Sequence, residues 1–182
     1  MDIGSGSGHW IDFFGQLFPE LDRVDACDVS AKSCEYLRRR FQDDQRVSVH
    51  HCSISQLQPA DTYDLVCLLG CAFHIVRDTQ LSELLNRISG CLAPDGVVIL
   101  NDLLPWVSHA NQFSHGGRLY NKFVRSRRRW KRLARHAGLA TSFVTNHAWV
   151  RAPGRIPEGH IVCLTRSASA APATVEDRAQ AA

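Results

Sequence analysis

Three glycines that alternate near the start of the chain have the types and spacing of a ligand-binding turn. Gly4, Gly6 and Gly8 follow Asp2-Ile3, which has the character of the end of a buried strand, and an apolar stretch with helical spacing begins directly after them. Glycines let the backbone approach a bound molecule closely and adopt positive φ at little cost. The first N–H groups of a helix favour an anionic or electron-rich group. Together these features predict a ligand cradle.

A carboxylate follows this cradle at a distance typical of ribose recognition. Asp28 ends the next apolar segment, 20 residues beyond Gly8. A carboxylate at that place can accept two hydrogen bonds from ribose hydroxyls. The dinucleotide pattern Gly-x-Gly-x-x-Gly is not matched, because residue 9 is a histidine. The spacing therefore favours a ribose-bearing ligand and disfavours a dehydrogenase.

His74, which follows the apolar run 63–70, is the best candidate for proton transfer. An imidazole titrates near the working pH and can take a proton from a hydroxyl or amine. A histidine that only lines a pocket is the alternative, and both readings stay open. Cys67 and Cys71 lie nearby, but their spacing matches no common zinc site, so no metal is expected. We interpret the seven cysteines as buried apolar residues in a reducing compartment.

Residues 104–124 show no clear period, and we expect an irregular segment that covers the substrate. His109 and His115 within it are second-choice bases. Its aromatic residues form either a substrate wall or ordinary packing under a long loop: Trp106, Phe113 and Tyr120.

The elements that must position these residues follow from apolar periodicity. Helices are expected at 10–18, 31–41, 79–92 and 127–136, strands at 23–28, 47–50, 63–70 and 97–103, a turn at 93–96, and an antiparallel pair at 143–150 and 160–165. Alternating strands and helices predict an α/β fold, Rossmann-like and doubly wound, with a mostly parallel sheet and a C-terminal antiparallel hairpin strand. Ligands bind such sheets at the carboxyl ends of the strands.

Length and composition are typical of one domain, expected at 1–166, with a disordered Ala/Ser/Pro-rich tail at 167–182. The sequence contains no apolar run of membrane-spanning length and no visible signal peptide, so a cytoplasmic location is expected. The oligomeric state is left open.

Charge is distributed unevenly along the chain. Residues 1–102 hold 8 Lys/Arg and 15 Asp/Glu, whereas residues 103–157 hold 11 Lys/Arg and no acid. Most of these cations lie in a basic segment at 118–135. A solvated helix face, shared by Arg125, Arg128, Arg129 and Arg132, is the simpler interpretation. Attraction of an anionic small molecule or of RNA is the functional one.

Five segments resemble the motifs of class I S-adenosylmethionine-dependent methyltransferases, in the family's order. They are Asp2–Gly8, Val24–Ser30, Tyr63–Ile75, Leu92–Leu100 and Arg132–Leu139. The resemblance extends over nearly all of residues 1–166. It implies S-adenosylmethionine as cofactor and the Rossmann-like fold expected above.

The resemblance also implies residue roles. The backbone of Gly4, Ser5, Gly6 and Gly8 would lie along the methionine part of the cofactor, and Asp2 would orient that loop. Asp28 would hold the ribose hydroxyls and Val29 would pack on adenine. Ser53, followed by Ile54, stands where an adenine-binding aspartate is usual, and the loss of charge assistance costs roughly 1 kcal/mol. The carbonyl near Leu69 and Gly70 would face the cofactor's amino group.

The leading hypothesis is direct methyl transfer to oxygen or nitrogen of a small molecule, an anionic one included, with His74 as base. RNA methylation guided by the basic segment and a non-catalytic binding protein are the alternatives. Family members usually have helices before the glycine turn, and Met1-Asp2-Ile3 supplies barely half a strand. A form extended upstream is therefore expected to be more stable and to bind cofactor more tightly.

Overall fold

The computed structural model describes residues 1–59, 61–105, 107–115, 118–146 and 159–167. Strands and helices alternate along most of this length, as the apolar periodicity predicted. The elements are β1 (Asp2–Ile3), α1 (His9–Leu17), β2 (Val24–Asp28), α2 (Ala31–Arg40), β3 (Val47–His51), β4 (Tyr63–Leu68), the 3-10 helix η1 (Ala72–His74), α3 (Asp78–Cys91), β5 (Leu92–Leu103), β6 (His109–His115), β7 (Arg118–Val124), α4 (Arg127–His136), β8 (Leu139–Asn146) and β9 (Gly159–Arg166).

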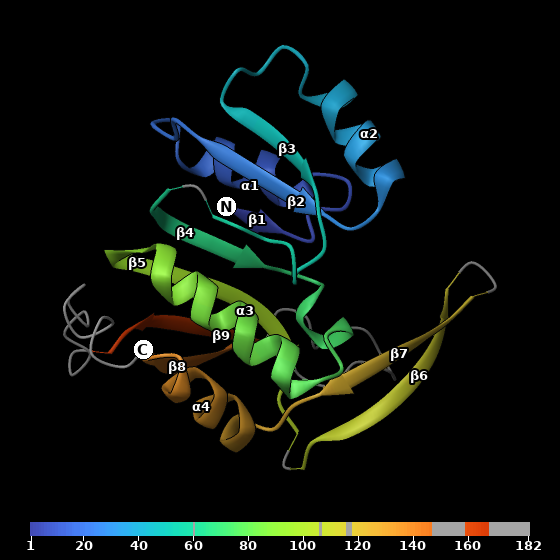
Figure 1. Cartoon of the computed structure of the whole chain (residues 1–182), viewed down its shortest axis with the longest axis vertical. Coiled ribbons are helices and arrows are strands. Elements are labelled where there is room, and N and C mark those ends of the chain that lie inside the picture. Colours follow the sequence, from blue (N-terminus) through green and yellow to red (C-terminus); the bar gives the residue numbers. More distant parts are fainter. Residues whose placement is uncertain (60, 106, 116–117, 147–158, 168–182) are drawn as a thin grey trace, which may run out of the picture.

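The main sheet has the strand order β3-β2-β1-β4-β5-β9-β8 (Figure 1). Neighbours from β3 to β5 are parallel, while β9 is antiparallel to both β5 and β8. The short strand β1 lies at the centre, where the chain order reverses between β2 and β4. The predicted fold class is confirmed, including the antiparallel C-terminal pair.

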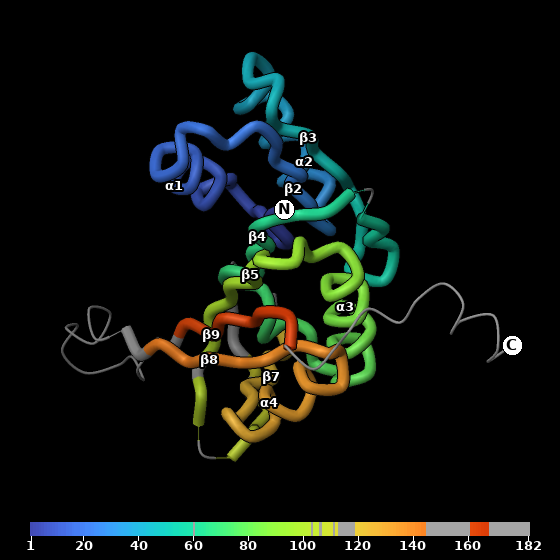
Figure 2. The backbone as a smooth tube through the Cα atoms, turned by 90° about the vertical axis from the view of Figure 1, so that its left-hand side faces the viewer, coloured from blue at the N-terminus to red at the C-terminus, as the bar shows by residue number. Residues whose placement is uncertain are grey.

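Helices cover both faces of this sheet. In the side view, α1 lies on one side of the strands and α3 on the other (Figure 2). The face under α3 and α4 holds the largest group of fully buried side chains, among them Val66, Leu68, Val98, Leu100, Val162 and Leu164. Alternate residues of β4, β5 and β9 supply this group, because side chains of a strand point to opposite faces in turn.

The expectation of an irregular segment at 104–124 is wrong. Residues 109–115 and 118–124 form an antiparallel two-stranded ribbon, β6–β7, in which His115 pairs with Arg118. The sequence between the two strands is Gly116-Gly117, and two glycines between extended segments are a sequence signal of a hairpin. The ribbon projects away from the main sheet (Figure 1).

The turn expected at 93–96 lies inside β5 instead of before it. Tyr63 pairs with Leu92 and Leu65 with Val97, so three extra residues of β5 bulge out between these two pairs. Gly96 is buried there, and a Cβ on it would lie 2.8 Å from the Tyr63 carbonyl oxygen. The turn residues therefore serve as an irregularity within a longer strand.

Some sequence-based expectations fall outside the described residues, namely the tail from 168 onward and the connection 147–158. β8 begins at Leu139, earlier than the predicted 143. No helix in the described part of the chain combines the length and apolarity needed to span a bilayer.

Candidate functional site

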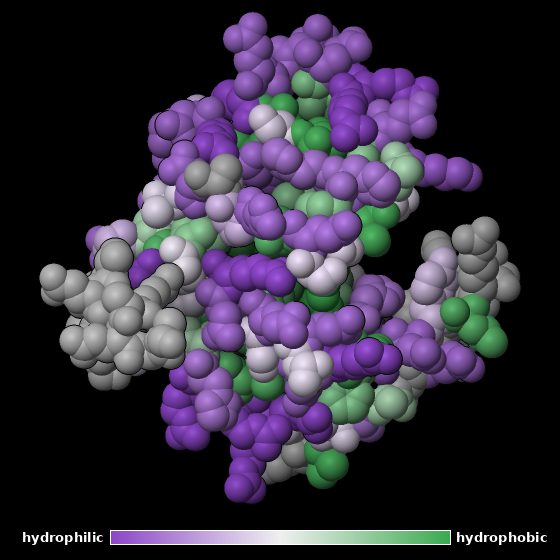
Figure 3. All heavy atoms as spheres, in the orientation of Figure 1, coloured by the Kyte–Doolittle hydropathy of each residue, from purple (hydrophilic) through white to green (hydrophobic). Residues whose placement is uncertain are grey.

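A cavity of about 690 Å³ lies at the carboxyl ends of the central strands. Its walls come from the end of β1 and β2, the loop after β3, the η1 segment, α3 and the ribbon. The lining residues are Ile3, Gly4, Cys27, Asp28, Val29, Cys52, Ser53, Ile54, Leu57, Gly70, Cys71, His74, Ile75, Val76, Gln80, Tyr120 and Asn121. On this side the molecular surface is hollowed between the body and the projecting ribbon (Figure 3). The cavity therefore occupies the position predicted for a ligand.

Gly4 is the residue of the glycine turn that lines this cavity. Gly4, Gly6 and Gly8 all have positive φ, at 77°, 54° and 78°. A Cβ on Gly4 would lie 2.7 Å from Cβ of Cys71, whereas a Cβ on Gly8 would meet Phe41 at 2.6 Å. Gly4 thus lets the turn approach the cavity wall, and Gly8 lets it pack on the side chains around α2.

Asp28 is held rigidly at the edge of the cavity. Its Oδ2 accepts a hydrogen bond from Gly6 N at 2.8 Å, and its Oδ1 accepts one from Ser30 N at 2.8 Å. Each carboxylate oxygen can accept a further bond, so both remain able to bind ligand hydroxyls. Val29, next along the chain, also lines the cavity and is 71% exposed.

The loop after β3 brings Ser53 and Ile54 to the same cavity. The Ser53 hydroxyl shares a 2.8 Å hydrogen bond with the Ser55 hydroxyl and donates to Gln56 Oε1 at 2.9 Å. The Ile54 carbonyl accepts from Arg87 Nη1 at 2.7 Å. These bonds fix the loop. They also engage the Ser53 hydroxyl, which the resemblance places at the adenine-binding position.

Gly70 lines the cavity on the opposite side, after β4. Its N–H donates to Asn101 Oδ1 at 2.6 Å, and its φ is 82° with open space where a Cβ would point. Cys71 donates from Sγ to the Ile3 carbonyl at 3.0 Å, which ties this wall to β1. Leu69 is buried and lies outside the lining.

Asp2, Ser5, Gly6 and Gly8 also lie outside the residues that line this cavity. Ser5 Oγ donates a 2.8 Å hydrogen bond to the Asp2 carbonyl, which links the start of the glycine turn to β1. The Asp2 side chain is buried beside a second cavity of about 280 Å³ next to α1, and its Oδ2 has no hydrogen-bond partner among the described residues. Burial raises the pKa of Asp2 to about 6.

His74 ends η1 and reaches the cavity with an exposed side chain. Partial desolvation lowers the pKa of His74, and the nearby Lys122 lowers that pKa further. The ring of Tyr120 lies edge-on, 6.4 Å from the His74 ring between centroids. A neutral imidazole beside an aromatic wall at pH 7 is chemically able to accept a proton.

The remaining predicted residues have different places. His109 is exposed on β6 and does not line the cavity, whereas Tyr120 does. Trp106 and the side chains of Phe113 and His115 lie outside what the structure describes. Among the described residues, no group of three or more His, Cys, Asp or Glu side chains is arranged for a metal ion.

Sequence reasoning missed several lining residues. Cys27 precedes Asp28, and Cys52 precedes Ser53, so adjacency to predicted site residues was an available indication. Gln80 on α3 and Asn121 on β7 carried no comparable pattern. Both depend on how α3 and the ribbon are placed in space.

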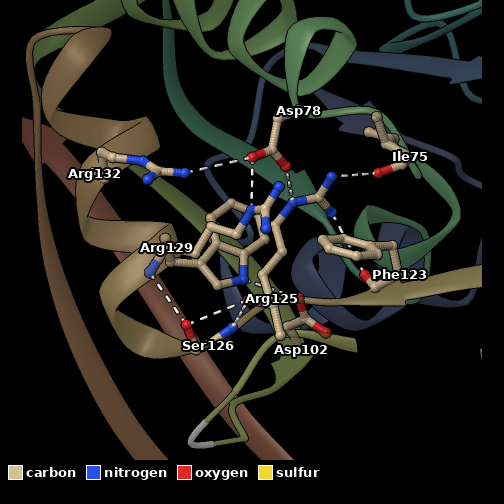
Figure 4. Close-up of polar contacts among 10 residues, drawn as sticks. Ile75, Asp78, Asp102, Phe123, Arg125, Ser126, Arg129 and Arg132 are labelled. Atoms are coloured by element: carbon tan, nitrogen blue, oxygen red, sulfur yellow. Dashed lines mark hydrogen bonds and ion pairs between the residues drawn. The ribbon is translucent and has the colours of Figure 1, made fainter. Parts of the chain in front are cut away.

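An ion-pair cluster joins α3, α4 and the segment after β7, and one of its members, Ile75, lines the cavity (Figure 4). The fully buried Arg125 donates from Nε to Asp78 Oδ1 at 3.0 Å and from Nη2 to the Ile75 carbonyl at 2.6 Å. Arg129 donates to the other oxygen of Asp78 at 2.6 Å. The expectation that Arg125 and Arg129 belong to a solvated helix face is therefore wrong, because both pair with the carboxylate of Asp78 on α3.

Comparison with known proteins is consistent with this architecture. The sequence model of a family described as "Methyltransferase domain" matches residues 1–96, more than half of the chain. The chain belongs to the methyltransferase domain family. The resemblance to class I S-adenosylmethionine-dependent methyltransferases is thereby confirmed, and the chain is a methyltransferase in which the glycine turn, Asp28 and β4 lie within the matched region. No curated protein matches its sequence.

Solved methyltransferase structures share the fold. An S-adenosylmethionine-dependent methyltransferase from Clostridium acetobutylicum superposes with a TM-score of 0.71 and 12% identity, covering 91% of this chain and 82% of that one. The DhpI–SAH complex superposes with a TM-score of 0.68 and 20% identity, covering 92% of this chain and 76% of that one. The glycopeptide N-methyltransferase MtfA, complexed with S-adenosylmethionine, superposes with a TM-score of 0.72 and 10% identity, covering 91% of this chain and 80% of that one. At these identities the likeness establishes the fold alone.

Proposed function

We propose that this methyltransferase transfers a methyl group from S-adenosylmethionine to an oxygen or nitrogen of a small molecule. The observation that carries the proposal is the single cavity that joins the glycine turn and Asp28 to His74 and Tyr120. A cofactor site and an acceptor site must share one cavity, because methyl transfer needs the nucleophile in line with the sulfonium carbon.

The cavity has the properties that this cofactor requires. Its volume of about 690 Å³ lies within the range of roughly 300–1,000 Å³ found for small-molecule sites. Asp28 offers fixed acceptors for two ribose hydroxyls, and the exposed Val29 offers an apolar surface for an adenine ring. The bound cofactor would supply an electrophilic methyl group.

His74 is proposed as the base in the acceptor half of the cavity. The acceptor's lone pair forms the new bond to the methyl carbon as the carbon–sulfur bond breaks and sulfur keeps the electron pair. His74 takes the proton that the acceptor oxygen or nitrogen loses. Its lowered pKa keeps the imidazole neutral and able to do so at pH 7.

The ribbon is proposed to select the acceptor. Tyr120 and Asn121 of β7 reach the cavity, so an aromatic face and an amide are available to a substrate. Lys122 lies beside them, with Nζ 3.9 Å from the centroid of the Phe73 ring, which favours an anionic substituent on the acceptor. The glycopeptide N-methyltransferase among the similar structures supports nitrogen as one acceptor class.

We also propose a cytoplasmic location. All seven cysteines are free thiols, which is the state expected in a reducing compartment.

Isotopic methyl transfer tests the proposal. The protein is incubated with S-adenosylmethionine labelled in its methyl group and an extract of small metabolites, and products are resolved by mass spectrometry. We expect a labelled small molecule whose formation is lost with excess S-adenosylhomocysteine. Tight binding of S-adenosylhomocysteine without labelled product would favour the non-catalytic alternative instead.

A further inference from the structure

A second large cavity lies apart from the methyl-transfer site, along α4 and the start of β8. Its volume is about 1180 Å³, and it shares no lining residue with the cavity described above. Six cationic side chains line it, and none of its lining residues is an acid: Arg127, Arg128, Arg129, Lys131, Arg132 and Arg135. Strongly hydrophilic residues gather over α4 in the surface view (Figure 3).

These cations are ordered in rows. Arg127, Lys131 and Arg135 are four residues apart, and so are Arg128 and Arg132. In a helix each such step advances about 6 Å along the axis. This separation is close to that of consecutive phosphates along one nucleic-acid strand. The groove therefore presents positive charges at the repeat of a phosphodiester backbone.

The arrangement is unfavourable for the helix itself. Like charges four residues apart repel one another. Arg127, Arg128 and Arg129 stand in the first turn, where the helix dipole disfavours cations and where α4 has no acid. Among the described residues, Asp78 is the one carboxylate paired with arginines of α4, and it contacts Arg129 and Arg132. Within the described part of the chain, Asp78 offsets this cost at Arg129 and Arg132, and the charges of Arg128, Lys131 and Arg135 are suited to an external anionic ligand.

The side-chain types favour phosphate over other anions. Arginine presents a planar fork that binds phosphate oxygens bidentately, and only one of the six cations is a lysine. An anionic membrane surface fits less well, because the apolar side of α4 is buried: Trp130, Leu133 and Ala134 face the core. Arg127 Cζ and Lys131 Nζ lie 5.4 and 5.7 Å from the centroid of the Phe143 ring. These side chains therefore occupy the ring, and a nucleic-acid base has no open aromatic face to stack on there.

We propose that the α4–β8 groove binds the phosphodiester backbone of single-stranded nucleic acid without regard to base sequence. This binding does not rest on the proposed methyl transfer, and it is measured without cofactor.

Fluorescence anisotropy of the full chain with a short labelled oligouridylate tests the inference. We expect binding at low salt that weakens steeply as salt rises. The triple variant R128A/K131A/R135A should bind at least about tenfold more weakly, with the slope of log K against log salt reduced by roughly 2. The matched variant K32A/R38A/R39A removes three exposed cations from α2 and should bind within about twofold of the parent.

Further arms separate the sources of negative charge. A labelled oligodeoxythymidylate should bind comparably, since the backbone carries the recognition. An oligoglutamate that competes as well as the oligouridylate would overturn the assignment to nucleic acid. A nucleoside triphosphate that competes equally well would overturn the inference that the ligand is a polymer. Absence of binding by the parent at low salt, or equal loss in both triple variants, would also contradict the proposal. The thermal unfolding midpoint of R128A/K131A/R135A should equal or exceed that of the parent, because like-charge repulsion is relieved.

Discussion

Arg125 and Asp78, which are 47 residues apart in the sequence, form an ion pair in which Arg125 Nε lies 3.0 Å from Asp78 Oδ1. Arg125 lies between the ribbon and α4, while Asp78 begins α3. Arg125 also holds the Ile75 carbonyl, one residue beyond His74. The pair therefore fixes the ribbon and the η1 segment to one another at the back of the cavity.

Replacing Asp78 by Asn should destabilise the fold by about 2–4 kcal/mol, because the buried guanidinium of Arg125 would lose its counter-charge. Urea unfolding at pH 7 measures this. The variant R132A is the control, since Arg132 is 56% exposed and 3.8 Å from Asp78, and it should cost less than about 1 kcal/mol. Equal losses in the two variants would contradict a special role for the buried pair.

Acid should weaken the same junction. Burial alone would raise the pKa of Asp78, but hydrogen bonds from Arg129 and Arg125 outweigh burial and hold the pKa below its ordinary 3.8. The contribution of Asp78 to stability is thus present above that value and is lost as pH falls through the lower folded-state pKa. The stability difference between the parent and D78N should shrink below about pH 4; a constant difference would be inconsistent with this assignment.

Asp2 should have the opposite effect on stability. Burial raises the pKa of Asp2 from 3.8 to about 6, so the native state binds this proton more tightly than the unfolded chain. The free energy of unfolding therefore falls as pH rises from about 4 to 6. The variant D2N should be more stable than the parent at pH 8, by up to about 3 kcal/mol, with little difference near pH 4. D43N, at an exposed position, is the control, and a similar gain in D43N would rule out burial as the cause.

Gly4 and Gly70 separate steric clash from backbone strain. Both have positive φ, but a Cβ on Gly4 meets Cys71 at 2.7 Å, whereas one on Gly70 meets nothing within 4 Å. The variant G70A should cost about 1–2 kcal/mol from the left-handed backbone alone, and G4A should cost clearly more. Thermal and urea unfolding of both variants measure the difference. If G4A were no worse than G70A, the close approach of Cys71 would have no energetic consequence.

Much of the fold could be predicted because its information is local. The apolar runs at β4 and β5 and the amphipathic pattern of α3 identify a buried sheet and its cover. The ribbon could not be read in the same way, since its strands project from the main sheet and carry mainly polar residues. Without a buried face, a strand shows little alternation.

The residues of the site also differ in whether local sequence or long-range packing places them. Asp28 and Gly4 follow from motif spacing within one strand–turn–helix unit, and both line the cavity. Asn121, Gln80 and the Arg125–Asp78 pair follow from long-range packing, which no spacing rule expresses. The basic segment illustrates the limit: the sequence shows its charge, but only the fold shows that Asp78 neutralises part of it.

His74 should appear in the pH profile of methyl transfer once an acceptor is known. With a neutral imidazole as base, kcat should fall on the acid side with an apparent pKa below 6.5, since burial and Lys122 both lower the pKa of His74. H74Q should lose this acid limb. K122Q should move the limb to higher pH while keeping it, because one cationic neighbour is removed. An unchanged limb in H74Q would exclude His74 as the base.

The most direct test of the central claim is calorimetric titration with S-adenosylhomocysteine on the parent and on D28A. Asp28 accepts bonds from Gly6 and Ser30 and leaves acceptor capacity for ribose hydroxyls. We predict saturable one-to-one binding by the parent and at least about tenfold weaker binding by D28A, equal to two lost hydrogen bonds of modest net strength. Circular dichroism of D28A serves as the control for folding. No detectable binding by the folded parent, or equal affinity in D28A, would contradict the account.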